Sequence, residues 1–321
     1  MDSTTPSGLE IRYHWEPKRK YELRYPVGAP ALYPGQEYQI DWLEVPSVTT
    51  ITDLSKDSGP LIWWGMTVGV AGVLELYQRE ILRPTEISGV GMVLATPGPV
   101  GIGVAGLVVA GQEQIVKLLK REKLTTNHVK STAGDRGTSC HDALDLWMRE
   151  GHKPDPAMFP PEERGYILGL LEFIRDLEVG GVEPLDCEVM VGSLEHGYAG
   201  RYDVRFKTNK ECAVVKRVTP KRGRQYAKLA PGRFLGDLKT SKGVYPESHF
   251  RQLEAYEGAS VESGYEPTDY RGIIHVHPGD PGDDKMPSEP FYEFVRSTAT
   301  LEDFLCLLEL HRSNLRIKGK A

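Results

Sequence analysis

The chain has 321 residues, and its 40% hydrophobic content supports a buried core in one large domain or two ordinary ones. Its formal net charge of −6 excludes a protein that is basic throughout, so any nucleic-acid contact must come from a local patch. The four scattered cysteines form no CxxC pair, and they fit thiols in a reducing cytosol better than a disulfide scaffold or a zinc site.

The first part of the chain, residues 1–45, is expected to be an irregular, partly β leader rich in Tyr, Pro and charge. It has no basic region followed by an apolar one, so it does not match a signal peptide, and we expect a cytoplasmic protein. Residues 45–51 alternate with β-branched side chains and predict a strand that enters a single domain over residues 46–321. Residues 46–136 are expected to form a helical subregion of that domain.

An uncharged stretch over residues 87–112 is long enough to span a bilayer. Its several glycines and the pair Pro97 and Pro99 weaken a continuous helix, and no cluster of Lys or Arg flanks it closely on one side. A membrane segment is therefore the less favoured alternative. We expect buried helices joined by a Gly/Pro turn, and no membrane partner.

Two amphipathic helices are predicted after the charged segment 117–123. The first begins near Gly137 and carries His141, Leu144 and Met148 on neighbouring turns. The second follows a Pro-Pro-Glu-Glu sequence at residues 160–163, which is a good helix start. Its buried stripe consists of Ile167, Leu170, Leu171, Ile174 and Leu177.

The hydrophobic period then changes from helical to two. Leu185, Cys187, Val189 and Val191 alternate with Asp186, Glu188 and Met190, which predicts a strand. Further strands are expected at residues 198–206, 234–241, 272–277 and 291–295, and helices at 246–258 and 301–315, the last capped by Thr298 or Thr300. This order predicts an α/β fold with a mixed central β-sheet flanked by helices and a helical N-terminal region.

Four short motifs follow one another along this predicted core. They are Gly137 with His141, then Gly200-Arg201-Tyr202-Asp203, then Gly236-Asp237-Leu238-Lys239, then Gln252 with Tyr256. On a strand, Asp237 and Lys239 are two residues apart and share one face. On a helix, the four-residue spacing of Gln252 and Tyr256 puts them on one face as well.

The two acids and the lysine of these motifs can hold a divalent cation and direct a water molecule onto a phosphodiester. We expect Asp203 and Asp237 to bind the metal, with the backbone carbonyl of Leu238 as a third ligand and Mg²⁺ or Mn²⁺ as the ion. Lys239 would orient the water or stabilise charge in the transition state.

Two further candidates lie outside the Asp-x-Lys strand. Glu188 is expected to contribute to catalysis through the metal or a bound water, although the solvent face of its strand would also explain it. His141 is a candidate metal ligand because imidazole tolerates Mn²⁺ better than Mg²⁺. The pair His275 and His277 alternates on a strand, and we interpret it as a solvated strand end.

The ordered motifs resemble those of the PD-(D/E)XK nuclease superfamily, specifically its RecB-like exonuclease branch, which includes the CRISPR-associated (Cas-four-like) exonucleases and many phage recombination nucleases. The resemblance covers about residues 137–256. It implies a restriction-endonuclease-like catalytic core over residues 137–321. It also implies the following roles: metal binding by His141, Asp203 and Asp237, catalysis by Lys239, and support of the site or the DNA end by Gln252 and Tyr256.

The chain departs from that pattern in its cysteines. The CRISPR-associated members carry an iron–sulfur cluster on four cysteines, three of them closely spaced near the C-terminus. Here Cys306 is the only cysteine after Cys212, so we expect no iron–sulfur cluster.

The chain also departs from the pattern in a basic insertion over residues 207–234, between Asp203 and Asp237. It holds many lysines and arginines against a single acid, Glu211, and we expect it to contact the phosphate backbone near the scissile bond. A flexible, solvated loop is the alternative. The proposed DNA contacts are Lys216, Arg217, Lys221, Arg222 and Arg224, and Tyr226 is placed to stack on a base.

The expected function is a metal-dependent DNA exonuclease of phage or bacterial recombination and repair, acting at duplex ends or on single strands. Its partners would be DNA and a single-strand annealing or recombination protein. Two alternatives remain open: an endonuclease of the same superfamily, which would share the catalytic core, and a catalytically silent DNA-binding or assembly module. The intact set of Asp203, Asp237 and Lys239 speaks against the silent module.

Overall fold

The computed structural model describes residues 1–15, 19–25, 42–55, 112–280 and 287–319, with a few isolated positions between 68 and 79. The chain divides into two compact units, one made of Met1–Lys56 with Arg136–Ala321 and the other of Asp57–Asp135. The expectation for the uncharged stretch, apart from Gln112, and most of the expected helical subregion lie outside the described residues. In the second unit, Gln112–Arg121 forms helix α3.

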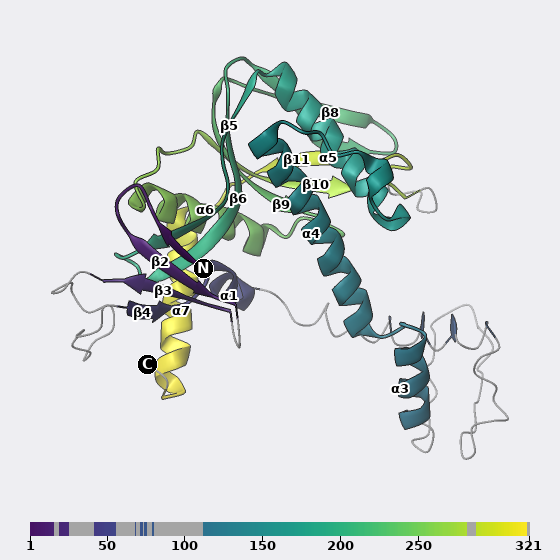
Figure 1. Ribbon diagram of the computed structural model, residues 1–321, viewed down its shortest axis with the longest axis horizontal. Coiled ribbons are helices and arrows are strands. Elements are labelled where there is room, and N and C mark those ends of the chain that lie inside the picture. The colour runs from purple at the N-terminus through teal and green to yellow at the C-terminus, as the bar shows by residue number, and fades with distance from the viewer. Residues whose placement is uncertain are drawn as a thin grey trace. The chain divides into compact units, whose positions relative to one another are not determined.

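A five-stranded sheet forms the centre of the larger unit (Figure 1), in the order β11-β10-β9-β6-β5. The neighbours β9 and β10 run parallel, and the other neighbours pair antiparallel. The strands are β5 (Val182–Ser193), β6 (Tyr198–Thr208), β9 (Gly232–Lys239), β10 (Tyr270–His277) and β11 (Phe291–Arg296). The predicted α/β class with a mixed sheet is therefore confirmed.

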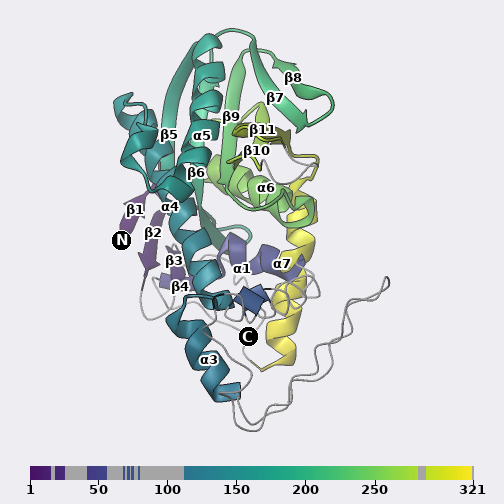
Figure 2. The same cartoon turned by 90° about the vertical axis from the view of Figure 1, so that its right-hand side faces the viewer.

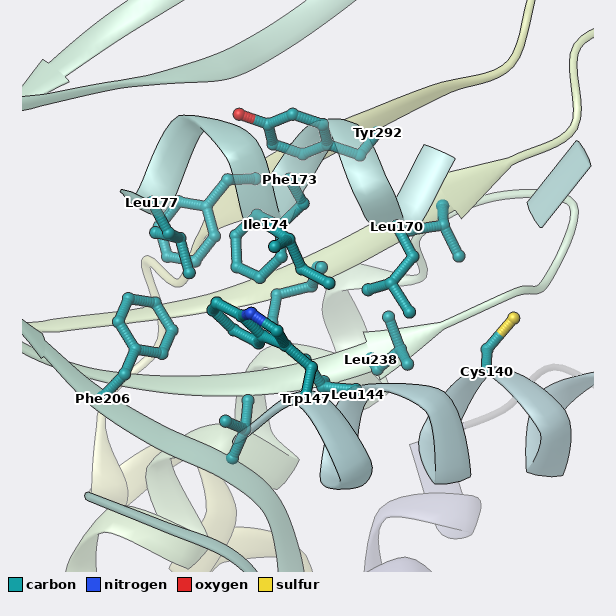
Figure 3. Packing of buried hydrophobic residues seen from close by; sticks show 14 of the residues in the cluster. Cys140, Leu144, Trp147, Leu170, Phe173, Ile174, Leu177, Phe206, Leu238 and Tyr292 are labelled. Atoms are coloured by element: carbon teal, nitrogen blue, oxygen red, sulfur yellow. The ribbon is translucent and has the colours of Figure 1, made fainter. Parts of the chain in front are cut away.

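One face of this sheet is covered by the part of α4 (Thr126–Glu150) that begins at Cys140 and by α5 (Pro161–Val179). Figure 3 shows Leu170, Ile174 and Leu177 of α5 facing Leu144 and Trp147 of α4, with Leu238 of β9 close by. The start of α5 follows from its sequence, because Pro161 occupies the first turn and Glu162 and Glu163 lie at the positive end of the helix.

The opposite face of the sheet is covered by α6 (Pro246–Glu262) and α7 (Leu301–Ile317). Leu235 and Ile273 belong to this second cluster, whereas Leu238 and Ile274 belong to the first, as the alternation of side chains along a strand requires. The N-terminus of α7 is fixed by a capping box between Thr300 and Asp303, so Thr300 is the cap.

The expected leader folds into a second, antiparallel sheet of four strands in the order β1-β2-β3-β4. Its strands are β1 (Asp2–Thr4), β2 (Glu10–His14), β3 (Lys20–Arg24) and β4 (Trp42–Val45). Its apolar face packs against Met190 and Ala199 of the central sheet. The fit is close at Gly192, where an added Cβ would lie 2.7 Å from Leu23 Cδ2.

The strand predicted at residues 45–51 is wrong. Only its first residue ends a strand, β4, and Val48–Thr52 forms the short helix α1, followed by a 3-10 helix at Asp53–Ser55. The hydroxyl of Ser47 accepts a hydrogen bond from the amide of Thr50 at 3.1 Å and so caps the helix. Val48 and Ile51 are buried three residues apart, which is a helical spacing, and this tertiary burial outweighs the β-branched composition.

The basic insertion is a folded hairpin of β7 (Cys212–Thr219) and β8 (Gly223–Leu229). It packs beside α5 and β11, because the amide of Val215 donates to Tyr292 Oη at 3.0 Å and Arg224 pairs with Glu172 at 2.8 Å. In Figure 2 the hairpin stands at the top of the view, and α6 lies below it. None of the helices in the described part of the chain is long and apolar enough to cross a membrane.

Candidate metal centre

Three side chains from three elements converge at one point of the larger unit: His141 of α4, Glu188 of β5 and Asp203 of β6. One ligand atom from each lies within 4.8 Å of the others. His141 Nδ1 is 3.2 Å from Glu188 Oε1 and 3.6 Å from Asp203 Oδ1. All three are half-buried, and one imidazole with two carboxylates is a donor set that suits a divalent cation.

Strand pairing places the two carboxylates opposite each other. Cys187 pairs with Val204 and Val189 with Tyr202, so Glu188 of β5 faces Asp203 of β6. Glu188 has a φ of 53°, a left-handed backbone conformation that is uncommon for a residue with a side chain. Such strain of about 1–3 kcal/mol concentrates at functional sites and needs surrounding contacts to hold it.

The Glu188 carboxylate is held from both sides. Arg201 Nε lies 2.9 Å from Oε2, and His141 contacts Oε1. Burial lowers the pKa of His141, but the charge of Asp203 and the hydrogen bond to Glu188 raise it more, to about 9. The protonated imidazole thus offsets one of the two carboxylate charges, and Arg201 pairs with Glu188 as well.

Asp203 also links the two sheet strands that carry the acids. The ladder between β6 and β9 ends at Val204 and Gly236, and one step further Asp203 Oδ2 accepts a hydrogen bond from the amide of Leu238 at 2.6 Å. Asp203 therefore lies beside the Asp237-Leu238-Lys239 segment, as the order of the sequence motifs predicted. The role of the Leu238 carbonyl as a ligand stays a prediction.

Asp237 is fully buried, with 1% of its surface exposed, and forms an ion pair with Lys239. Apart from this ion pair, neither of its carboxylate oxygens has a hydrogen-bond partner among the described residues. Burial raises the pKa of Asp237, and the neighbouring Lys239 partly offsets this. A buried carboxylate with an open oxygen is costly, so the geometry indicates a missing partner for Asp237.

Lys239 is close to all the acids of the site. Burial lowers its pKa, but the charges of Asp237 and Asp203, and more weakly of Glu188, raise it above the usual value. Its ammonium therefore stays charged. The predicted site is thus assembled in two adjoining groups: His141, Glu188 and Asp203 form one, and Asp237 with Lys239 forms the other.

Gln252 and Tyr256 form a buried pair on α6. Gln252 Nε2 donates to Tyr256 Oη at 2.9 Å, and both side chains are buried. The Tyr256 ring lies over Gly200, where an added Cβ would be 2.5 Å from its Cε1 atom. Burial raises the pKa of Tyr256, and the charge of Asp237 adds to this. The pair therefore lies beside the carboxylates, and its supporting role stays a prediction.

Sequence reasoning missed two residues near these acids. His249 is buried in the first turn of α6, its Nδ1 accepts the amide of Tyr245 at 3.2 Å, and it is one of the groups that act on the pKa of Asp237. It shares a helical face with Gln252 and Tyr256, so that spacing could have identified it. Arg201 lies within the motif Gly200-Arg201-Tyr202-Asp203, but no role was predicted for it.

The interpretation of His275 and His277 as a solvated strand end is wrong. Their exposed fractions are only 4% and 9%. His275 Nε2 lies 2.8 Å from the carbonyl oxygen of Ser241, and the His277 ring stacks on Phe291 at 5.1 Å between centroids. Alternation alone could not show that β11 and the end of β9 cover this part of β10.

The residues of the basic hairpin are not brought to the metal centre. The hairpin leaves the sheet where Thr208 pairs with Gly232, five residues along β6 from Asp203, which corresponds to about 16 Å. Arg224 is engaged by Glu172. The other four proposed contacts, Lys216, Arg217, Lys221 and Arg222, are exposed. The hairpin is folded, not a flexible loop, and its contact with DNA stays a prediction.

Comparison with known proteins adds no further constraint on this site. No protein-family model matches the chain, and no curated protein matches it. The side-chain geometry at His141, Glu188 and Asp203 is therefore the ground on which a function can be proposed.

Proposed function

We propose that the protein is a metal-dependent DNA exonuclease of the PD-(D/E)XK superfamily, in its RecB-like branch. The observation that carries this proposal is the convergence of His141, Glu188 and Asp203 beside buried Asp237 and its ion-pair partner Lys239. These residues are spread from 141 to 239 along the chain. A purely structural ion-pair network does not need an open oxygen on a fully buried carboxylate.

The donor set fits Mn²⁺ or Mg²⁺. His141, Glu188 and Asp203 would hold the ion, and the open oxygen of Asp237 would complete the protein's share of the ligands. When bound, such an ion lowers the pKa of a coordinated water and offsets charge on the scissile phosphate. The four-cysteine arrangement of an iron–sulfur cluster is not expected.

The surrounding residues would position and balance these groups. Arg201 fixes the orientation of the Glu188 carboxylate, and the Leu238 amide fixes that of Asp203. The Lys239 ammonium is held at the carboxylates by its charge, where it can orient the attacking water and stabilise negative charge on the phosphate oxygens.

A cleavage assay tests this proposal. End-labelled linear DNA and covalently closed circular DNA are incubated with the protein in Mg²⁺, in Mn²⁺ and in a chelator. An exonuclease degrades only the linear DNA, and only with the metal. Cleavage of the closed circle would instead assign the site to an endonuclease of the same superfamily, and no cleavage of either DNA would leave a non-catalytic DNA-binding module.

A further inference from the structure

A row of aromatic rings runs along the inner face of the N-terminal sheet. Tyr21 of β3 and Tyr13 of β2 pair across the strands, with ring centroids 4.8 Å apart. Tyr13 and Trp15 follow at 6.0 Å, edge to face. The guanidinium of Arg19 lies over the Trp15 ring, 4.3 Å from its centroid. We call Tyr21, Tyr13, Trp15 and Arg19 the aromatic row.

The inner end of the aromatic row borders the metal centre. Tyr21 is buried in one cluster with Met190 of β5 and Ala199 of β6, which lie two residues along their strands from Glu188 and Arg201. Glu188 belongs to the candidate ligand set, and Arg201 holds its carboxylate at 2.9 Å. The row therefore begins beside the residues that would hold the ion.

The outer end of the aromatic row is open to solvent. Trp15 is 58% exposed although Arg19 stacks on it. Arg19 has no ion-pair partner within the part of the chain that the structure describes. Because Trp15 follows β2 and Arg19 precedes β3, their contact could serve only to close this connection. That account explains neither the exposure of a tryptophan nor the continuity of the row with Glu188.

The other face of the same sheet differs in its chemistry. Its charges are neutralised within the sheet by ion pairs, and Arg12 lies over Trp42 at 3.8 Å. These ion pairs are Arg12 with Asp2 and Glu22, Lys20 with Glu22 and Glu44, and Arg24 with Glu10. The inner face combines an exposed Trp15 at its outer end and a cation without an acidic partner among the described residues with a buried end next to the strands of the metal centre.

We propose that the aromatic row binds the unpaired bases of a single DNA strand and leads the strand to the metal centre. Bases would stack on Trp15 and Tyr13, while Arg19 and Arg201 lie beside the phosphates. Stacking on aromatic side chains together with nearby arginines is how sequence-independent single-strand binding is built. Delivery to the metal centre rests on the proposed nuclease function, whereas the binding of bases does not.

The test measures binding without metal. A fluorescein-labelled single strand of about 20 nucleotides, longer than the roughly 4–16 nucleotides that one binding fold covers, is titrated with protein in a chelator. Fluorescence anisotropy reports the affinity. Trp15→Ala should weaken single-strand binding by about 5- to 150-fold, and Trp15→Phe should restore part of it. Trp42→Ala, which removes the arginine-stacked tryptophan of the other face, should change it less than twofold.

The outcomes separate this inference from the proposed function. Unchanged binding by Trp15→Ala, or an equal loss in Trp42→Ala, overturns the aromatic row even if the protein cleaves DNA in Mn²⁺. A selective loss in Trp15→Ala supports the row even if the protein cleaves nothing. Thermal denaturation of each variant shows whether the fold is retained. Arg19→Ala leaves Trp15 in place. It should weaken binding and flatten the log–log dependence of affinity on salt by about 0.7 to 0.9, the contribution of one phosphate contact.

Discussion

Asp203 contacts His141 and also accepts the amide of Leu238, so its substitution by asparagine separates the charge of the candidate site from its hydrogen bonding. Asp203→Asn keeps the size of the side chain and an oxygen for the Leu238 amide, but removes the negative charge. We expect Mn²⁺ binding, followed by calorimetric titration, to fall at least tenfold and cleavage to be abolished, because anionic ligands provide most of the cation's binding energy.

Asp145→Asn is a matched control for that substitution. Asp145 lies one turn after His141 on α4 and is paired with Arg149 at 2.6 Å, outside the ligand set. The control should retain metal binding and cleavage. If Asp203→Asn cleaved DNA as fast as the wild type, the assignment of the metal centre would be wrong.

Lys239→Ala should affect turnover and not metal affinity, because a cation does not ligate a cation. Removing a positioned donor to a developing negative charge costs about 10²–10³-fold in rate. Single-turnover cleavage at saturating Mn²⁺ measures the rate, and calorimetric titration measures the metal affinity. Lys242→Ala, at an exposed lysine just beyond the strand, is the control. A Lys239→Ala variant that lost mainly metal affinity would contradict this role.

The sequence predicted which residues lie at the candidate site better than which of them pair with each other. His141, Glu188 and Asp203 do converge, and Asp237 and Lys239 lie beside them. The sequence could not show that Lys239 holds Asp237 in an ion pair, since that depends on which charges share the same buried space. Nor could it place Tyr21 in one cluster with Met190 and Ala199, because that packing joins two sheets distant in the sequence.

At the scale of the elements, the basic hairpin of β7 and β8 allows a prediction of how DNA affinity depends on salt concentration. Lys221→Ala combined with Arg222→Ala should flatten the log–log dependence of DNA affinity on salt by about 1.4 to 1.8, because each phosphate contact contributes roughly 0.7 to 0.9. Lys228→Ala, at a lysine already paired with Glu211, should change the slope less. Anisotropy titrations at several salt concentrations measure the slopes.

The length of the DNA should also matter for this hairpin. Its base is about 16 Å along β6 from Asp203, so the double variant should slow cleavage of long DNA but not of a very short substrate. An unchanged salt slope would mean that these two lysine and arginine side chains are merely solvated.

The buried His277 at the end of β10 allows a prediction of how the free energy of unfolding changes with pH. Burial is the main reason that the pKa of His277 is lowered. The other groups that act on its pKa are His275, Asp280, Arg136 and Lys242. In the unfolded chain the imidazole takes up a proton below about pH 6.5, whereas in the folded protein it resists protonation. The free energy of unfolding should therefore be undiminished above pH 6.5 and fall as the pH drops through the lowered pKa.

His277→Phe tests this acid effect while it preserves the ring stacked on Phe291. Urea denaturation at pH 7.5 and 5 should show a smaller loss of stability on acidification in the variant than in the wild type. His152→Phe, at an exposed histidine, serves as the control and should keep the wild-type difference. Equal acid sensitivity of His277→Phe and the wild type would contradict the prediction.

The helices and strands were predictable where hydrophobic periodicity and local propensity favour the same structure. α5 and α7 have clear apolar stripes and strong first turns, and both form nearly where the sequence placed them. The strand predicted over residues 48–52 is wrong because local β propensity and tertiary burial favour different structures there, and burial decides. The two strands of the basic hairpin were not predicted, because Val214 and Val215 are both buried and Lys216 and Arg217 both exposed, a pattern that its β-bulge produces.

For the whole molecule, the contact between the two sheets predicts a single cooperative unfolding transition of the larger unit. Leu23 is fully buried, and its side chain fills the space above Gly192. Leu23→Ala should lower the free energy of unfolding by about 2–5 kcal/mol without splitting the transition. Leu310→Ala, at a half-exposed leucine of α7, should cost much less.

Urea denaturation followed by both tryptophan fluorescence and circular dichroism measures this effect. Two separate transitions in the Leu23→Ala variant would mean that residues 1–45 behave as an independent leader, as the sequence suggested. Coincident transitions would mean that the N-terminal sheet and the central sheet share one core. The sequence could not decide this, because nothing in the pattern of residues 1–45 shows what their apolar face packs against.

The hydrogen bond from the Leu238 amide to Asp203 has a consequence for how this position can change over generations. Asp203 continues the pairing of β6 with β9 where the backbone ladder stops, so its side chain serves folding in addition to the chemistry proposed for it. A related protein that no longer cleaved DNA would not need the negative charge at this position. It would still need a side-chain oxygen to accept the hydrogen bond of the Leu238 amide. Drift at position 203 should therefore favour asparagine over alanine, and an inactive descendant would retain a trace of the site in its sheet.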